Sequence, residues 1–73
     1  MKKLRILLSN EDDLTLCFEK DDDYLKAFNN LTKAIEMNLT FFYDGLIEDI
    51  VDYETITAVF NPAHIIAFCE VKE

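Results

Sequence analysis

The sequence predicts an α+β domain of element order ββαβββ, in which one amphipathic helix packs on a small, mostly antiparallel sheet. Apolar and polar residues alternate in residues 3–19, which is the period of a strand, whereas residues 21–37 repeat at helical spacing. The chain has 73 residues, 51% of them hydrophobic, with one Gly and one Pro. This length fits a single domain, 1–73, and the composition excludes disorder and collagen-like repeats.

The first two strands are expected to form a β-hairpin. Apolar side chains alternate with basic ones in residues 3–8, and a second alternating stretch covers residues 14–19. The polar residues 10–13 between them are typical of a turn.

The helix is expected over residues 21–37, because apolar side chains recur at helical spacing from Tyr24 to Ile35. The run Asp21–Asp23 supplies an N-cap and two carboxylates at the positive end of the helix dipole. Asn38 is expected to be a left-handed C-cap.

The remaining elements are expected to be three strands. Asp44-Gly45 is predicted to be a turn, and the segment 46–54 is predicted to be irregular or one helical turn. Pro62 fixes its own backbone angle and so favours a tight connection before the last strand. The predicted strands are residues 39–43, 55–61 and 65–71.

Several of these strands carry apolar side chains on both faces, although one helix covers only one face of a sheet. The uncovered face would exceed what soluble monomers usually expose. The sheet therefore either curls into a small barrel or uses this face for self-association, which predicts a homo-oligomer, a dimer in the simplest case. The residues expected on this face are Leu7, Phe42, Val59, Ile66 and Phe68.

The formal net charge is -8, and residues 34–71 contain neither Lys nor Arg. A basic footprint for direct binding of DNA or RNA is missing. Spaced carboxylates could instead imitate nucleic-acid phosphates and occupy the groove of a basic host protein. The other interpretation is a solubilising surface. The carboxylates concerned are Asp44, Glu48, Asp49, Asp52 and Glu54.

The sequence predicts no enzyme activity, no metal and no cofactor. His64 and Ser9 are the only residues of their types, and neither acidic run has the pattern of a calcium loop. Cys17 and Cys69 are expected to be buried thiols of a cytoplasmic protein, with a disulfide only if their strands are neighbours. The longest apolar run, residues 65–69, is too short to cross a membrane.

The segment Ile-Thr-Ala-Val-Phe-Asn-Pro-Ala-His-Ile-Ile, residues 56–66, resembles the ending of many small uncharacterised phage and plasmid proteins. Those proteins commonly close with a strand, an Asn-Pro-x-His-Ile turn and a final strand. The resemblance implies an accessory protein of a mobile element, without a defined activity. The acidic connection, residues 45–54, departs from that pattern.

Overall fold

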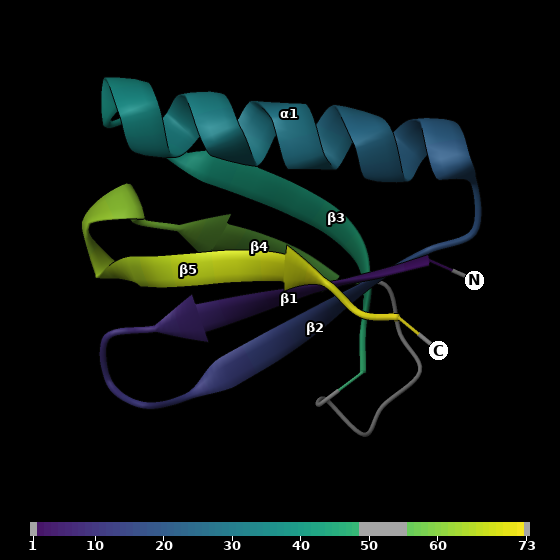
Figure 1. The fold of residues 1–73 in the computed structure, drawn as a ribbon, viewed down its shortest axis with the longest axis horizontal. Coiled ribbons are helices and arrows are strands. Elements are labelled where there is room, and N and C mark those ends of the chain that lie inside the picture. The colour runs from purple at the N-terminus through teal and green to yellow at the C-terminus, as the bar shows by residue number, and fades with distance from the viewer. Residues whose placement is uncertain (1, 49–55, 73) are drawn as a thin grey trace.

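The computed structural model describes residues 2–48 and 56–72. One helix packs on a five-stranded antiparallel sheet, which confirms the predicted α+β order ββαβββ (Figure 1). The elements are β1 (Lys2–Leu8), β2 (Asp13–Phe18), α1 (Asp21–Met37), β3 (Phe41–Ile47), β4 (Ile56–Phe60), the 3₁₀ helix η1 (Pro62–His64) and β5 (Ile65–Glu70).

The strand order is β4-β3-β2-β1-β5, so the two edge strands, β4 and β5, are consecutive in the chain. Residues 61–64 alone join them, whereas the edges of a flat sheet would lie four inter-strand spacings apart, about 19 Å. The sheet therefore curls. The Ser9 amide donates to the His64 carbonyl at 2.8 Å and ties the β1–β2 turn to η1. Among the described residues β4 pairs only with β3 and β5 only with β1, so this small barrel stays partly open.

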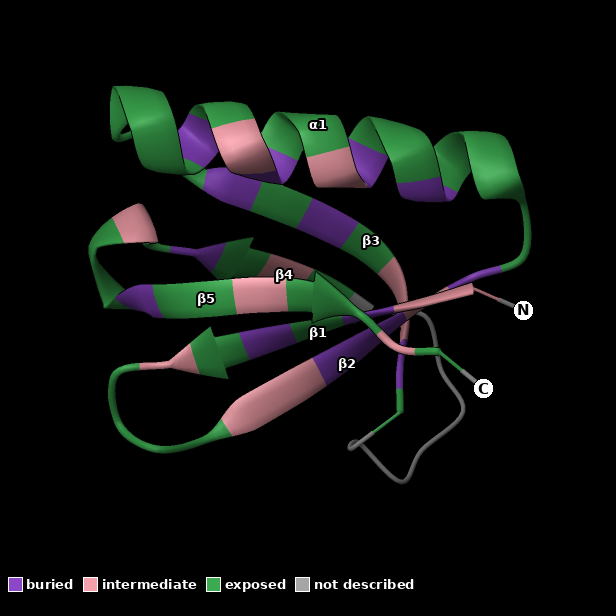
Figure 2. Ribbon diagram, viewed as in Figure 1, coloured by how far each residue is buried: buried purple, intermediate pink, exposed green. Residues whose placement is uncertain are grey.

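The core lies between the concave face of the sheet and α1. Figure 2 shows the buried residues of α1 on the side that faces the strands. Burying a large aliphatic side chain contributes about 1.5–3 kcal/mol, so the helix is held mainly by this stripe. The buried helix residues are Tyr24, Ala27, Leu31 and Ala34, and the fully buried large side chains are Leu4, Ile6, Leu16 and Leu31.

The helix ends agree with the sequence except at the N-cap. The cap position is Lys20, whose side chain makes no capping hydrogen bond, so the prediction of an Asp N-cap is wrong. All three carboxylates of Asp21–Asp23 lie instead in the first turn, where they interact favourably with the helix dipole. Asn38 has φ 56° and ψ 48°, which confirms the left-handed C-cap.

The expected turn at Asp44-Gly45 is wrong, because β3 continues through both residues to Ile47. Gly45 has φ +157°, and a side chain there would overlap the Tyr43 hydroxyl. That hydroxyl shares its one proton between the carbonyl oxygens of Cys17 (2.7 Å) and Leu46 (2.8 Å). The glycine therefore makes room for a buried tyrosine instead of reversing the chain.

A β-bulge in β5 interrupts the alternation that the sequence suggests. Leu8 pairs with Ile65, but the next residue back, Leu7, pairs with Ala67. Ile66 is therefore the extra residue of the bulge. Strict alternation would place Phe68 on the same face as Ile66. The extra residue reverses this, so each β5 side chain after Ile66 lies on the other face.

Phe68 shows the consequence. It pairs with the buried Ile6, and its ring meets Phe28 of α1 edge to face, with centroids 5.1 Å apart. The prediction that Phe68 lies on the uncovered face is therefore wrong. Cys69 now pairs with the exposed Arg5 and is itself exposed, so the prediction that its thiol is buried is also wrong.

Candidate protein-interaction surfaces

The outer face of β3 and β4 exposes a compact apolar group. Phe42 pairs directly with Val59, and the two residues are 68% and 60% exposed. Leu39, which precedes β3, is 50% exposed and lines a hollow of about 320 Å³ together with Phe42. We call Leu39, Phe42 and Val59 the Phe42 patch. The sequence predicted that this strand begins at residue 39, but β3 begins only at Phe41.

The other expected residues of the uncovered face form a separate pair. Leu7 and Ile66 lie next to the bulge on the neighbouring strands β1 and β5 and are 36% and 68% exposed. Leu7 pairs with Asp13 at the start of β2, whereas Phe42 pairs with Val59 across β3 and β4. The structure thus divides these residues into two pairs, and Val59 lines a hollow with Leu8, Ser9 and Asn10 beside the β1–β2 turn.

Charged side chains occupy part of the outer face of the sheet. Lys3 of β1 donates to Glu48 at 3.1 Å, and the Arg5 guanidinium forms a two-nitrogen contact with one oxygen of Asp13. These ion pairs make part of the outer face around β1 and β2 polar.

The acidic surface predicted from the sequence is only partly within the described residues. Asp44 accepts a hydrogen bond from the Thr57 hydroxyl, and Glu48 forms the ion pair with Lys3. The other members of the set, Asp49, Asp52 and Glu54, lie outside the described residues. Imitation of a nucleic acid stays a prediction.

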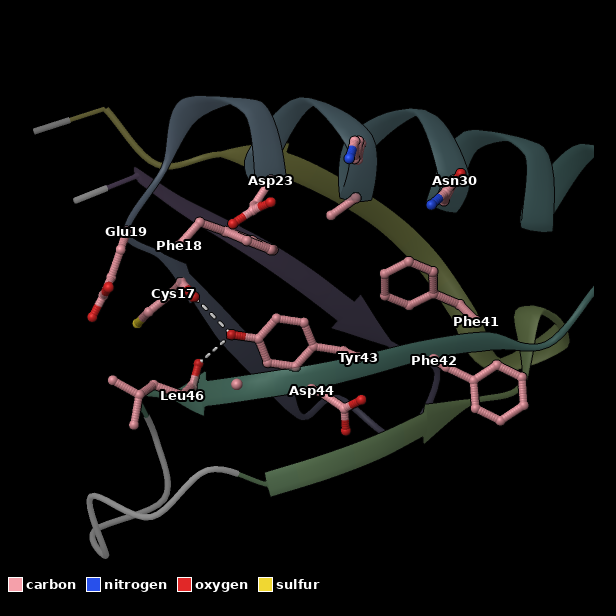
Figure 3. Close-up of a pocket in the computed structure, with 13 residues that line it drawn as sticks. Cys17, Phe18, Glu19, Asp23, Asn30, Phe41, Phe42, Tyr43, Asp44 and Leu46 are labelled. Atoms are coloured by element: carbon pink, nitrogen blue, oxygen red, sulfur yellow. Dashed lines mark hydrogen bonds between the residues drawn. The ribbon is translucent and has the colours of Figure 1, made fainter.

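A cleft of about 560 Å³ lies between α1, the end of β2 and β3, and we call it the α1–β3 cleft. In Figure 3, Asp23 and Asn30 project from α1 towards β3, while Glu19 lies at the end of β2. Tyr43 spans the floor, and burial raises the pKa of its hydroxyl above 10.0. The cleft combines an aromatic floor with a largely acidic rim. No sequence pattern indicated it, because its residues come from three elements.

The only serine and the only histidine meet beside a second hollow. Ser9 Oγ lies 3.2 Å from His64 Nδ1, and both residues are exposed. The side chains lining the hollow include no carboxylate that could orient the imidazole. We interpret the contact as a tie between the β1–β2 turn and η1. Sequence separation hid it, since the residues are 55 positions apart.

The described residues contain no cluster of three or more side chains able to hold a metal ion. Cys17 and Cys69 are not joined by a disulfide, and β1 lies between the strands that carry them. In residues 2–48 and 56–72 no helix has the length and hydropathy needed to cross a membrane.

No protein-family model, curated protein or solved structure matches this chain. The likeness of residues 56–66 to phage and plasmid proteins therefore stays a prediction. Function has to be inferred from the surfaces described above.

Proposed function

We propose that this chain is a non-enzymatic protein-interaction module that forms a homodimer through the Phe42 patch. The observation that carries the proposal is the Phe42–Val59 pair, two large apolar side chains that lie directly opposite each other and are 68% and 60% exposed. Isolated exposed apolar residues are ordinary, but a paired group extended by Leu39 is a patch that burial would stabilise.

A second copy suits the chemistry of this patch. Stable dimers bury roughly 800 Å² per partner, with an apolar centre and a polar rim. The patch supplies the centre, and Asp44 with Thr57, one step along the same face, supplies rim polarity. In a symmetric dimer the same patch meets itself, which self-complementary apolar side chains allow.

Charge opposes this association. Each copy carries a formal charge of -8, so two copies repel each other until salt screens them. Added salt also favours burial of apolar surface when the anion is sulfate. The dimer is therefore expected to strengthen as ionic strength rises, whereas a complex of opposite charges would weaken.

Light scattering after size-exclusion chromatography tests the proposal. We expect the wild type to elute with the mass of a dimer and Val59→Asp to elute as a folded monomer, because a buried carboxylate without a partner opposes association strongly. Leu25→Asp is the matched control: it adds the same charge at a 54% exposed apolar residue of α1 and should leave the dimer intact.

Equal loss of the dimer in both variants would show that added charge alone dissociates the copies. A wild type that stays monomeric at every concentration and salt would rule out the proposal. Ile66→Asp tests the pair of Leu7 and Ile66. If Ile66→Asp dissociates the dimer and Val59→Asp does not, the interface lies at the bulge and not at the Phe42 patch.

A further inference from the structure

We propose that the α1–β3 cleft binds an extended, positively charged segment of another protein, which adds as a strand to the free edge of β3. This site shares Phe42 with the self-association surface, whereas Val59 and Leu39 do not line it. The proposal rests on an exposed strand edge, the charge of the rim and the way the cleft is held open.

The strand edge arises because β3 runs past the end of β2. β2 ends at Phe18, and its pairing with β3 covers only residues 46–47 of β3. The Glu48 amide donates to a β2 carbonyl at 2.9 Å, and main-chain groups alternate between the two edges of a strand. Phe42 and Asp44 therefore direct their main-chain N–H and C=O groups towards the cleft. An added strand would take up these groups.

The charge of the rim selects the partner. The side chains lining the cleft include three carboxylates, Glu19, Asp23 and Asp44, against one ammonium, Lys26. Successive side chains of an added strand point alternately towards α1 and towards the outer face. Lys or Arg residues on the α1 side would meet Asp23, and those on the outer side would meet Asp44. An acidic or neutral segment would leave the rim without counter-charges.

Tyr43 keeps the cleft from closing. Its hydroxyl shares one proton between the Cys17 carbonyl of β2 and the Leu46 carbonyl of β3, at the place where the two strands part. The side chain fits there because Gly45 has no Cβ. The volume of about 560 Å³ lies within the range of ligand-binding clefts.

Fluorescence anisotropy with a labelled synthetic peptide tests the proposal. The probe is a peptide of about nine residues that alternates Lys and Val, in buffer of about 0.15 M salt, which suppresses long-range attraction. We expect saturable binding that Asp23→Lys weakens about tenfold or more. The matched control is Asp22→Lys, which changes the net charge equally on the same exposed helical turn but outside the cleft, and we expect it to weaken binding less than about twofold.

A second peptide tests the strand addition. N-methylation of alternate backbone amides removes the donors of one edge and leaves the charge unchanged, so we expect binding to be lost. Equal weakening by Asp22→Lys and Asp23→Lys, unaltered binding of the methylated peptide, or absence of binding would each overturn the proposal. Because Val59 lies outside the cleft, Val59→Asp should bind the peptide normally, which separates this site from the dimer.

Discussion

Tyr43 connects the packing of one residue to the shape of a surface. Its ring lies over Gly45, and its hydroxyl satisfies two carbonyls, one from each of the strands that part beside it. Burial, which disfavours the charged phenolate, raises the pKa of this hydroxyl above the ordinary value of 10.0. A buried hydroxyl of this kind stabilises the fold only while it stays protonated.

We expect Tyr43→Phe to lower the free energy of unfolding by about 1–3 kcal/mol at neutral pH, because two carbonyls lose their donor. The folded state also binds the phenolic proton more tightly than the unfolded state. The contribution is therefore complete below pH 10 and is lost as pH rises through the folded pKa. Urea denaturation at neutral pH and above pH 10 measures both effects. A variant as stable as the wild type, with the same decline at high pH, would contradict this role.

At the scale of single residues, the sequence predicted burial better than contacts. The alternation in residues 3–8 and the helical spacing in residues 21–37 agree with the burial of Leu4, Ile6 and Leu31. The prediction of a turn at Asp44-Gly45 was wrong. A glycine can form a tight turn or leave room for a neighbouring ring, and only the fold shows that Tyr43 packs beside Gly45. The Ser9–His64 contact depends on the curl of the sheet and has no local signal.

At the scale of elements, the helix was predictable to the residue and the last strand was not. The bounds of α1, Asp21–Met37, coincide with the apolar period and its flanking signals. The β5 bulge at Ile66 leaves no mark in an apolar run, yet it moves Phe68 to the helix side and Cys69 to the outer side. One inserted residue thus changes which side chains a partner can reach.

The bulge makes Phe68→Asp a test of folding instead of association. The substitution places a carboxylate against Phe28 and beside the buried Ile6, so we expect the free energy of unfolding to fall by about 3–5 kcal/mol. Urea denaturation followed by far-ultraviolet circular dichroism measures this loss. Phe42→Asp is the matched comparison: it replaces the same residue type at an exposed position, and we expect the monomer to keep most of its stability. A stable Phe68→Asp protein would contradict the bulge.

At the scale of the whole molecule, the curl of the sheet determines what is exposed. The sequence left two outcomes open, a curled sheet that hides its apolar face or an interface between copies. The structure combines a curled sheet with two exposed apolar pairs, Phe42–Val59 and Leu7–Ile66, while ion pairs make part of the outer face polar. The strand order that produces the curl depends on long-range pairing, which local patterns do not encode.

Charge acts differently on the two proposed contacts. The formal charge of -8 opposes association of identical copies and attracts a basic segment. Rising ionic strength should therefore strengthen the dimer and weaken binding in the α1–β3 cleft. Since Phe42 belongs to both surfaces, these opposite responses to salt distinguish the two contacts in one protein.

The location of the dimer contact can be measured directly by isotope-filtered nuclear Overhauser spectroscopy on an equal mixture of ¹³C-labelled and unlabelled protein. Only protons in different copies give cross-peaks in this experiment. We predict intermolecular cross-peaks between the Phe42 ring and the Val59 methyl groups, since these side chains are paired and exposed on one face. A dimer whose intermolecular cross-peaks arise only from Leu7 and Ile66, or a mixture without such cross-peaks, would contradict self-association through the Phe42 patch.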